Sequence, residues 1–570
     1  MKKINGSRIL LETLYRVGVR DVFGYPGGAV IPIYDEIYKF DKIKHYFSRH
    51  EQGAAHEADG YARASGKVGV CIATSGPGAS NLVTGIMTAH MDSTPLLAIT
   101  GQVGISMLGK DSFQESDIVG TTLPITKMNY LVTDIRDLPR VIKEGHYIAR
   151  TGRPGPVLVD IPKDVQMAEM DMEEYERLYS EELDLPGYNP KPQNGTEAVK
   201  EAVELIKGSR RPLIIAGAGV IKSGSSPELR EFAEKNNIPV TMTLLGLGGF
   251  PTNNPLSLGM LGMHGTVPAN LATDEADLVI AAGIRFDDRI TGNPKEFCKN
   301  AKIIHIDIDP AEIRKNKEVD IAIVADLKGV LVEFNKSIKG LDNREWLRRV
   351  QDLKAQYPME YPKSADGKLM PQEVLEEVDK LLKGEAIIAT DVGQNQMWAA
   401  QYLSYTNPKS IITSGGSGTM GFGLPSAIGA QVARPDKKVL AVVGDGGFQM
   451  TFHELMMAKQ YNLPLKILIL NNSFLGMVRQ WQEMFNEKRY SFVDLSLNPD
   501  FSKIAEAYGI RSATIRTKEE MKENLEKLLN LDEPVIINCI VEKEANVLPM
   551  IPAGTTVRHM VGKRGVLDGA

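Results

Sequence analysis

Short apolar runs that end in Gly, Asp or Asn recur along the whole chain and alternate with stretches of helical spacing. Examples are RPLIIAGAGV, DLVIAAGIRF, KIIHIDIDP, KKVLAVVGDGG and PLKILILNN. Strands that are apolar throughout are typical of parallel sheets covered by helices on both faces. Such sheets bind ligands beyond the carboxyl ends of their strands. We therefore predict an α/β fold made of doubly wound parallel sheets.

The chain is long enough for several such sheets. Its 570 residues suggest about three or four domains. Two changes in composition mark linkers: an acidic stretch at 170–188 that runs into a Pro/Asn-rich tract, and a charged region at 343–368. We predict three domains, over residues 1–185, 190–345 and 365–570.

Composition excludes several classes of protein. The 66 basic and 72 acidic residues are too balanced for a general nucleic-acid binder. Three separated cysteines, without CxxC, favour a reduced, cytoplasmic compartment. Residues 68–91 and 410–433 lack Asp, Glu, Lys and Arg, but they are rich in Gly, Ser, Thr and Pro. These stretches read as buried helices entered through loops, so we expect no membrane contact.

The strongest local pattern lies in the third unit. An apolar strand runs into Gly444-Asp445-Gly446-Gly447, and a second strand ends in Asn471-Asn472, 27 residues beyond Asp445. That is the length of one βαβ unit, whose crossover puts both strand ends at the same edge of a sheet. Carboxylate and amide oxygens there suit Mg²⁺, which completes its shell with phosphate oxygens. A lone GDG would more often cap a turn; the distant Asn pair favours the metal.

This spacing resembles the binding motif of thiamine diphosphate (ThDP) enzymes. The resemblance implies that Asp445, Asn472 and the main chain of Phe474 hold Mg²⁺ and the cofactor diphosphate. It also assigns Glu51, in Arg49-His50-Glu51-Gln52-Gly53, as the carboxylate that activates the cofactor. On its own, a Glu at a helix start is more often a partner of the helix dipole. The ThDP positions implied are Gly28, Glu51, Gln394, Asn395, Gly418, Met420, Gly446, Gly447 and Met477.

Within the ThDP enzymes, the chain is similar to the acetohydroxyacid synthase (acetolactate synthase) large subunits. The stretches that carry this include FGYPGGA, RHEQGAAHEADGYARASGKVGVCIATSGPGASNLVTGI, DSFQESDIVG, GIRFDDRITG and LNNSFLGMVRQWQ. The resemblance implies decarboxylation of pyruvate and ligation to pyruvate or 2-ketobutyrate, the first common step of branched-chain amino-acid biosynthesis. It further implies a homodimer or homotetramer with active sites at the subunit interface, and a small regulatory subunit.

Two residues would handle the acceptor ketoacid. Arg289 matches the arginine that binds the acceptor carboxylate, and its planar fork suits that contact. Trp481 matches the side chain that selects the larger ketoacid. Without the resemblance, Arg289 would be read as a surface charge paired with Asp287 or Asp288, and Trp481 as core. The other substrate positions implied are Phe113, Gln114, Lys163 and Met263.

One position departs from the family. Relatives commonly read Gly-Gln-His-Gln where this chain has Gly393-Gln394-Asn395-Gln396. Asn can still donate a hydrogen bond to a phosphate oxygen, but it cannot carry the charge of an imidazolium. We expect Asn395 to contact the diphosphate, and we expect a His there to leave turnover largely intact.

The middle unit has a strand leading to Gly217-Ala218-Gly219, a weak dinucleotide signal. Strand ends at Gly283 and at Asp307 strengthen it, because acids there can take ribose hydroxyls. These stretches resemble the family's FAD domain, where the flavin is structural. An inherited domain that binds nothing is the alternative. The FAD positions implied are Arg153, Gly217, Gly219, Thr243, Leu244, Met263, His264, Gly283, Arg285, Asp288, Asp307 and Asp326.

Three rival functions stay open at this point: a flavin-free catabolic acetolactate synthase, a flavin-using pyruvate oxidase, and a non-catalytic nucleotide-binding protein. The 285–289 stretch with HIDID argues against the first, and Trp481 with Arg289 argues against the second. Joint presence of Glu51, Gln114, Asp445 and Asn472 argues against the third.

Overall fold

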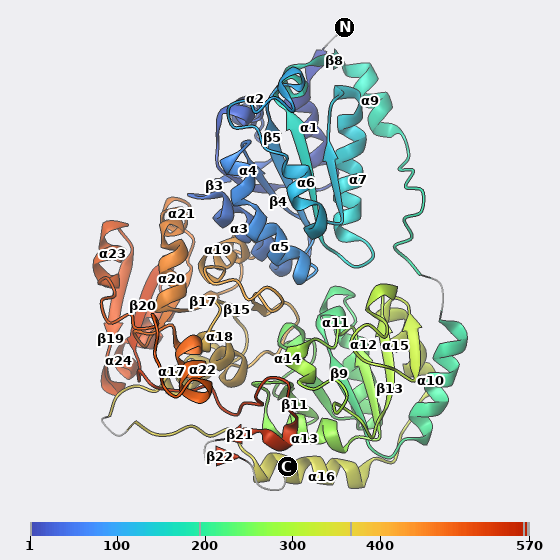
Figure 1. The fold of residues 1–570 in the computed structure, drawn as a ribbon, viewed down its shortest axis with the longest axis vertical. Helices are drawn as coiled ribbons and strands as arrows, with labels where there is room; N and C mark the ends of the chain where they lie inside the picture. Colours follow the sequence, from blue (N-terminus) through green and yellow to red (C-terminus); the bar gives the residue numbers. More distant parts are fainter. Residues whose placement is uncertain (1–2, 193–194, 365–366, 563–564, 567–570) are drawn as a thin grey trace.

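The computed structural model describes residues 3–192, 195–364, 367–562 and 565–566. Three six-stranded sheets, each flanked by helices, form the body of the chain (Figure 1). Every pairing within these sheets is parallel. The predicted fold class is confirmed.

The first sheet has the strand order β3-β2-β4-β5-β7-β6. The order reverses between β2 and β4, and loops at such a switch point form ligand crevices. Its strands are β2 (Asp21–Gly24), β3 (Lys44–Phe47), β4 (Gly69–Ala73), β5 (Leu96–Gln102), β6 (Met128–Leu131) and β7 (Pro156–Pro162). Its helices are α1 (Gly6–Arg16), α2 (Ile31–Tyr38), α3 (Glu51–Ser65), α4 (Pro77–Asn81), α5 (Val83–Met91), α6 (Ile118–Thr122), α7 (Leu138–Arg150), α8 (Lys163–Met167) and α9 (Met172–Ser180).

The second sheet has the order β11-β10-β9-β12-β13-β14. In chain order this is 3-2-1-4-5-6, the arrangement of dinucleotide-binding sheets, with the switch point between β9 and β12. Its strands are β9 (Pro212–Ala216), β10 (Val240–Met242), β11 (Ser257–Met260), β12 (Leu278–Ala282), β13 (Lys302–Asp307) and β14 (Ile321–Val324). Its helices are α10 (Thr196–Gly208), α11 (Ala218–Lys222), α12 (Ser226–Asn236), α13 (Val267–Glu275), α14 (Asp288–Thr291), α15 (Leu327–Ser337) and α16 (Arg344–Gln356).

The third sheet repeats the topology of the first, with the order β16-β15-β17-β18-β20-β19 and a switch point between β15 and β17. Its strands are β15 (Ile387–Thr390), β16 (Ile411–Ile412), β17 (Val439–Gly444), β18 (Lys466–Asn471), β19 (Arg511–Ile515) and β20 (Val535–Ile540). Its helices are α17 (Pro371–Leu382), α18 (Gln394–Tyr402), α19 (Gly423–Ala433), α20 (Asp445–Thr451), α21 (Leu455–Gln460), α22 (Gly476–Phe485), α23 (Phe501–Ala507) and α24 (Lys518–Leu529).

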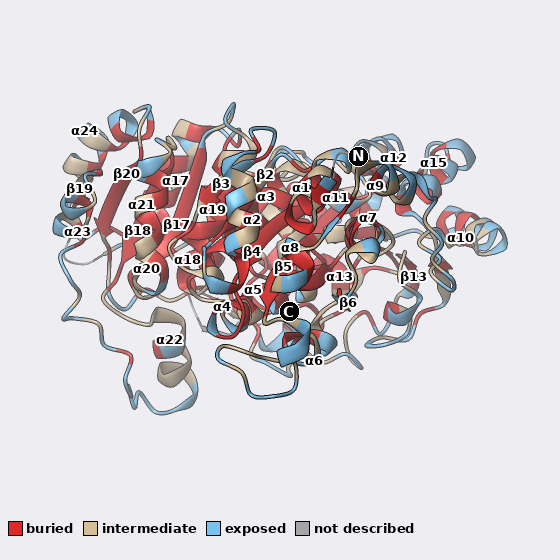
Figure 2. Cartoon of the chain, turned by 90° about the horizontal axis from the view of Figure 1, so that it is seen from above, coloured by how far each residue is buried: buried red, intermediate tan, exposed pale blue. Residues whose placement is uncertain are grey.

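Buried strands lie at the centre of each sheet and exposed helix faces lie outside, as Figure 2 shows for β17, β18 and α10. The third sheet shares one apolar core with the first and another with the second. Helix α3 lies directly on α19, where a Cβ on Gly60 would come 2.0 Å from the Ser426 carbonyl oxygen. Small residues in both helices permit this close approach.

The two charge-poor stretches of the sequence form β4 with α4 and α5, and β16 with α19. No helix among the described residues combines the length and the apolar character needed to cross a membrane. Cys71, Cys298 and Cys539 are buried free thiols.

Candidate active site

A cavity of about 1330 Å³ is lined by residues of the second and third units, together with 91–93 and 150–154 of the first unit. Carboxyl-end residues of both sheets line it, among them Gly283, Asp307 and Val392. The sequence-predicted residues on its wall are Arg153, Gly219, Thr243, Leu244, Met263, His264, Gly283, Arg285, Asp288, Arg289, Asp307, Asp326, Gly418, Met420, Met477 and Trp481. The cavity therefore gathers most of the predicted flavin positions together with both acceptor positions.

The two acceptor residues meet in this cavity. Arg289 belongs to α14, and its guanidinium carbon lies 5.8 Å from the centre of the Trp481 ring, which α22 supplies. The Arg289 Nη1 is 4.0 Å from Met263 Sδ and 3.8 Å from an exposed Asp288 oxygen. Trp481 is half-buried, so it is not a core residue. A half-exposed cation beside an aromatic wall suits a small carboxylate with a short alkyl group.

The predicted metal residues follow two neighbouring strands. β17 and β18 are parallel, with Gly444 opposite Leu470, so Asp445 and Asn472 emerge at one edge. Asp445 is buried, and burial raises its pKa to about 6. Asn472 Oδ1 accepts the main-chain N–H of Phe474 at 3.1 Å. One buried carboxylate and one amide oxygen at a sheet edge fit Mg²⁺ that keeps phosphate and water ligands.

Asn472 is fixed from its other side by Gln394. Its Nδ2 donates to Gln394 Oε1 at 3.1 Å, while Gln394 Nε2 donates to Gln480 Oε1 at 2.9 Å and to the Ala545 carbonyl at 2.8 Å. Gln394 is buried at the start of α18. The sequence predicts Gln394 as a diphosphate neighbour; its contacts show that it orients the amide of Asn472.

The contacts of Asn395 do not provide the expected phosphate donor. Its Nδ2 donates to the carbonyls of Asp391 and Val442, at 3.1 and 3.0 Å. Both amide hydrogens are thus used inside the third sheet, and the side chain is buried. Asn395 ties the ends of β15 and β17 together, and its contact with the diphosphate stays a prediction.

A residue that sequence reasoning missed, Asp391, organises the loop before α19. Its carboxylate accepts the main-chain N–H groups of Val392, Gly421 and Gly423 at 2.8 to 3.1 Å. Gly447 is required beside it, because a Cβ there would lie 2.2 Å from Asp391 Oδ1. Asp391 thereby positions the loop that carries Gly418 and Met420.

A second group of predicted residues lies at the carboxyl edge of the first sheet. Glu51 is the first residue of α3, and its Oε2 accepts Asn81 Nδ2 at 3.0 Å. The loop of Phe113 and Gln114 rests against Gly76, where a Cβ would meet the Gln114 carbonyl oxygen at 2.8 Å.

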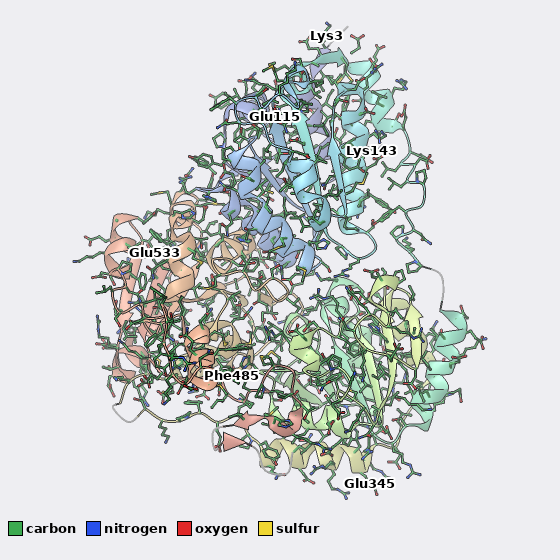
Figure 3. All side chains as sticks on the ribbon, viewed as in Figure 1. Lys3, Glu115, Lys143, Glu345, Phe485 and Glu533 are labelled. Atoms are coloured by element: carbon green, nitrogen blue, oxygen red, sulfur yellow. The ribbon has the colours of Figure 1, made fainter. Side chains whose placement is uncertain are left out.

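The other members of this group, Gly28, Phe113 and Lys163, lie in the segments that follow β2, β5 and β7. Phe113 is 88% exposed. Glu115, labelled in Figure 3, accepts main-chain N–H groups of its own loop. Gly28 begins the turn before α2, and Lys163 begins α8 directly after β7.

Among the described residues of one chain, the group around Glu51 does not bond to the group around Asp445. Within the described ranges, no hydrogen bond or ion pair links Glu51, Gln114 or Lys163 to Asp445 or Asn472, and none of the five lines the large cavity. The helix start at Glu51 instead contacts the third unit through Glu454, whose carboxylate accepts the N–H groups of Arg49 and His50.

Several of the residues predicted to bind FAD have structural roles that need no ligand. Gly217 and Gly219 are needed for packing, because a Cβ on Gly219 would lie 2.6 Å from the Gly283 Cα; Gly217 does not line the cavity. Asp326 caps α15. Arg153 pairs with Asp309 and Glu312 at 3.1 and 2.5 Å.

His264 and Asp307 fit a ligand better. The buried Nδ1 of His264 has no hydrogen-bond partner in the described part of the chain, and burial lowers the His264 pKa to about 4. Burial raises the pKa of Asp307 to about 6. A neutral imidazole with an unpartnered Nδ1 and a strand-end acid on one cavity wall, above a sheet of dinucleotide-binding order, fit FAD.

Comparisons with known proteins agree with this geometry. Three family models match the chain: the N-terminal TPP binding domain of thiamine pyrophosphate enzymes over residues 4–121, the central domain over 199–334 and the C-terminal TPP binding domain over 391–539. The acetolactate synthase large subunit of Lactococcus lactis subsp. lactis is 48% identical over 565 residues, which cover 98% of this chain and 96% of that protein. This chain belongs to the acetolactate synthase large-subunit family of thiamine pyrophosphate enzymes.

Other members of the acetolactate synthase family are similarly close. The probable large subunit of Methanocaldococcus jannaschii is 48% identical, with 98% of this chain and 95% of that protein covered. Acetolactate synthase 1, chloroplastic, of Zea mays is 47% identical, with 99% and 89% covered. The family and enzyme class predicted from the sequence are confirmed, and so is thiamine diphosphate (thiamine pyrophosphate) as the cofactor. The roles of single residues stay predictions.

Proposed function

We propose that this chain is the catalytic subunit that makes acetolactate from pyruvate in branched-chain amino-acid biosynthesis. One carbon–carbon bond of the first pyruvate breaks with release of CO₂, and a new bond joins the remaining two-carbon unit to the carbonyl of a second 2-ketoacid. Thiamine diphosphate, when bound, supplies the electron sink for both steps. The observation that carries the proposal is the meeting of Arg289 and Trp481 in a cavity lined by carboxyl-end residues of the second and third sheets.

Glu51 would control the proton of the cofactor. Its position at the start of α3, with Oε2 held by Asn81, leaves Oε1 to share a proton with a ring nitrogen of the aminopyrimidine. Replacement by Gln removes that exchangeable proton and keeps the size of the side chain.

Mg²⁺ would be held by Asp445, by Asn472 and by the main-chain carbonyl of Phe474. The support is the buried acid and the fixed amide at adjacent ends of β17 and β18. The ion would anchor the diphosphate at the switch point of the third sheet, where Gly446 and Gly447 let the main chain approach closely.

FAD would occupy the larger part of the cavity, between the second and third sheets. Support comes from the strand order of the second sheet and from the cavity-facing His264 and Asp307. Since the overall reaction transfers no net electrons, the flavin would be structural.

Acceptor selection would fall to Arg289 and Trp481. Arg289 binds the carboxylate, and the Trp481 ring limits the alkyl group beside it. The same site accepts pyruvate and 2-ketobutyrate, because one extra methylene changes binding by only about 1 to 3 kcal/mol.

We further propose an active site completed by a second copy of the chain. Support comes from the contacts of Glu51 and Asp445: among the described residues, no hydrogen bond or ion pair of one chain links the Glu51 group to the Asp445 group. A homodimer, alone or paired into a tetramer, would bring Glu51 of one copy to Asp445 of the other. The large-subunit names of the relatives also suggest a small regulatory partner. The cytoplasmic location stays a prediction from the cysteines.

Glu51→Gln tests the proposed function. Turnover of pyruvate should be abolished while ThDP and FAD remain bound, and full activity would overturn the mechanism. Asp35→Asn, an exposed acid in α2 of the same unit, is the matched control. Rival activities are separated in the same assay. The proposal expects a yellow protein that contains FAD and consumes no oxygen with pyruvate, whereas a pyruvate oxidase consumes oxygen and a flavin-free synthase is colourless.

A further inference from the structure

A buried carboxylate of the third unit holds the main chain that leads into α3. Glu454 ends the 3-10 turn Phe452–Glu454 and is fully buried. Its Oε2 accepts the N–H of Arg49 at 2.9 Å, and its Oε1 accepts those of Arg49 and His50 at 3.1 and 3.0 Å. Arg49 and His50 directly precede Glu51, so Glu454 fixes the turn from which the predicted catalytic carboxylate projects.

The fit around Glu454 leaves no room for a side chain at position 53. A Cβ on Gly53 would lie 2.1 Å from Glu454 Oε1. Gly53 belongs to the first turn of α3, two residues after Glu51. The contact is thus built from both sides, with a glycine in the helix and an acid across from it.

A second acid, Glu57, lies one helical turn beyond Gly53, on the face of α3 that packs against Glu454. Glu57 is fully buried, and its Oε2 accepts the Ser48 hydroxyl at 2.5 Å. Its Oε1 is buried without a hydrogen-bond donor among the described residues. An orphaned carboxylate oxygen is costly, but a protonated Glu57 can donate from that oxygen to Glu454.

The surroundings of Glu57 and Glu454 favour a state in which the two carboxyl groups share one proton. Burial raises the pKa of Glu57 well above its ordinary value, and the negative charge of Glu454 raises it further. Burial also raises the pKa of Glu454 above its ordinary value. Two carboxylates in one buried site cannot both ionise readily. The groups that face the pair are Arg49, which favours ionisation of both acids, and His50, His453, Cys71 and Tyr508.

We propose that Glu57 and Glu454 form a proton-sharing positioning pair that holds Glu51 in place for catalysis. The proton sits on Glu57, which donates to Glu454, and Glu454 keeps both oxygens available to the main chain of Arg49 and His50. This inference rests on the proposed function of Glu51. Neither acid touches the substrate, so both act through Glu51.

The stabilisation that the Glu57–Glu454 pair provides should decrease as pH rises. The folded-state pKa of each acid is raised, so the stabilisation by the shared proton is present in full below the ordinary Glu pKa and is lost as pH rises through the raised values. Loss of the proton leaves two negative charges in contact, and the turn at Arg49 and His50 should loosen. Turnover should therefore fall on the alkaline side while the chain stays folded.

The test compares Glu57→Gln, Glu454→Gln and Glu144→Gln in the full chain. Glu144 is a buried acid of α7 in the same unit, bonded to Arg140 and Tyr130, and serves as the matched control. Glu57→Gln keeps a donor toward Glu454 at every pH. Glu454→Gln replaces one acceptor oxygen with an N–H₂ group that faces main-chain N–H groups.

Two readouts are needed: hydrogen exchange of the peptide 47–54 by mass spectrometry, and the pH profile of kcat. Glu454→Gln should speed exchange at 47–54 and lower kcat roughly tenfold with KM for pyruvate within about twofold, because a displaced reacting group costs turnover more than binding. Glu57→Gln should keep kcat near pH 7 and move the alkaline fall to higher pH. Glu144→Gln should match the wild type in both.

Two results would overturn the positioning role: unchanged exchange at 47–54 in Glu454→Gln, or a Glu57→Gln profile that superimposes on the wild type. A wild-type chain that makes no acetolactate would instead refute the proposed function. The exchange comparison needs no substrate, so it still decides whether the pair fixes the turn.

Discussion

The guanidinium carbon of Arg289 lies 5.8 Å from the centre of the Trp481 ring, although the two residues come from helices of different units, α14 and α22. Arg289 follows β12, and Trp481 follows β18. Their meeting depends on how the second and third sheets face each other across the cavity. A carboxylate bound by Arg289 would therefore present its alkyl group to Trp481.

Trp481→Leu should weaken the preference for 2-ketobutyrate over pyruvate by about tenfold, since one methylene is worth about 1 to 3 kcal/mol in a fitted pocket. The measurement is the ratio of the two products when both ketoacids compete. Phe485→Leu is the control. The Phe485 ring (labelled in Figure 3) packs against Trp481, with 5.5 Å between the ring centres, but Phe485 does not line the cavity. An unchanged product ratio in Trp481→Leu would refute the selector role.

Asn498 should support the metal through Asp445. Its Nδ2 donates to Asp445 Oδ2 at 2.6 Å. We expect Asn498→Ala to raise the Mg²⁺ concentration for half-maximal activity by about tenfold, as loss of an outer partner of a metal ligand commonly does. Asn524→Ala, which removes an amide bonded only to its own helix α24, should leave the Mg²⁺ requirement unchanged. If Asn498→Ala and Asn524→Ala needed the same Mg²⁺ concentration, Asn498 would not support the metal through Asp445.

Asn395→His is now expected to be harmful, in contrast to the sequence prediction. The two buried hydrogen bonds of Asn395 to main-chain carbonyls are worth about 2 kcal/mol together, and a neutral His has a single ring N–H with which to replace them. Thermal unfolding should show a lower Tm than for Asn486→His, a change at an exposed position. Full stability and turnover in Asn395→His would restore the original expectation.

Mixing two inactive variants tests whether the site is shared between chains. Glu51→Gln and Asp445→Asn should each be inactive alone. After subunits exchange, both substitutions fall in one site of a mixed dimer and leave the other intact, so roughly a quarter of wild-type activity should return. Recovery is measured after co-refolding or co-expression. Activity that stays at zero, with mixed dimers shown by mass, would place the whole site in one chain.

Local pattern predicted the edges of the sheets well. Asp445, Asn472 and Gly283 directly follow strands whose apolar runs are evident in the sequence, and parallel strands place their ends at one edge. Glu51 is the first residue of α3, four positions after Phe47, the last residue of β3. Element boundaries depend on capping, here by His50, which a pattern does not specify.

Contacts between distant residues were not predictable. Glu454 bonds to Arg49 across 405 positions, and its own segment, FHEL, reads as an ordinary helix. Asp391 and Asn498 likewise act on residues whose proximity arises from sheet packing. The one available signal was for Asp391, an acid that directly follows an apolar strand and precedes a glycine-rich turn.

The most direct test is product analysis of the purified chain with pyruvate, ThDP, Mg²⁺ and FAD. We expect acetolactate and CO₂ in equal amounts, without oxygen consumption, and no acetolactate from Glu51→Gln. If both cofactors are bound and neither pyruvate nor 2-ketobutyrate yields a ligated product, even with a candidate small subunit added, the proposed carboligase is contradicted.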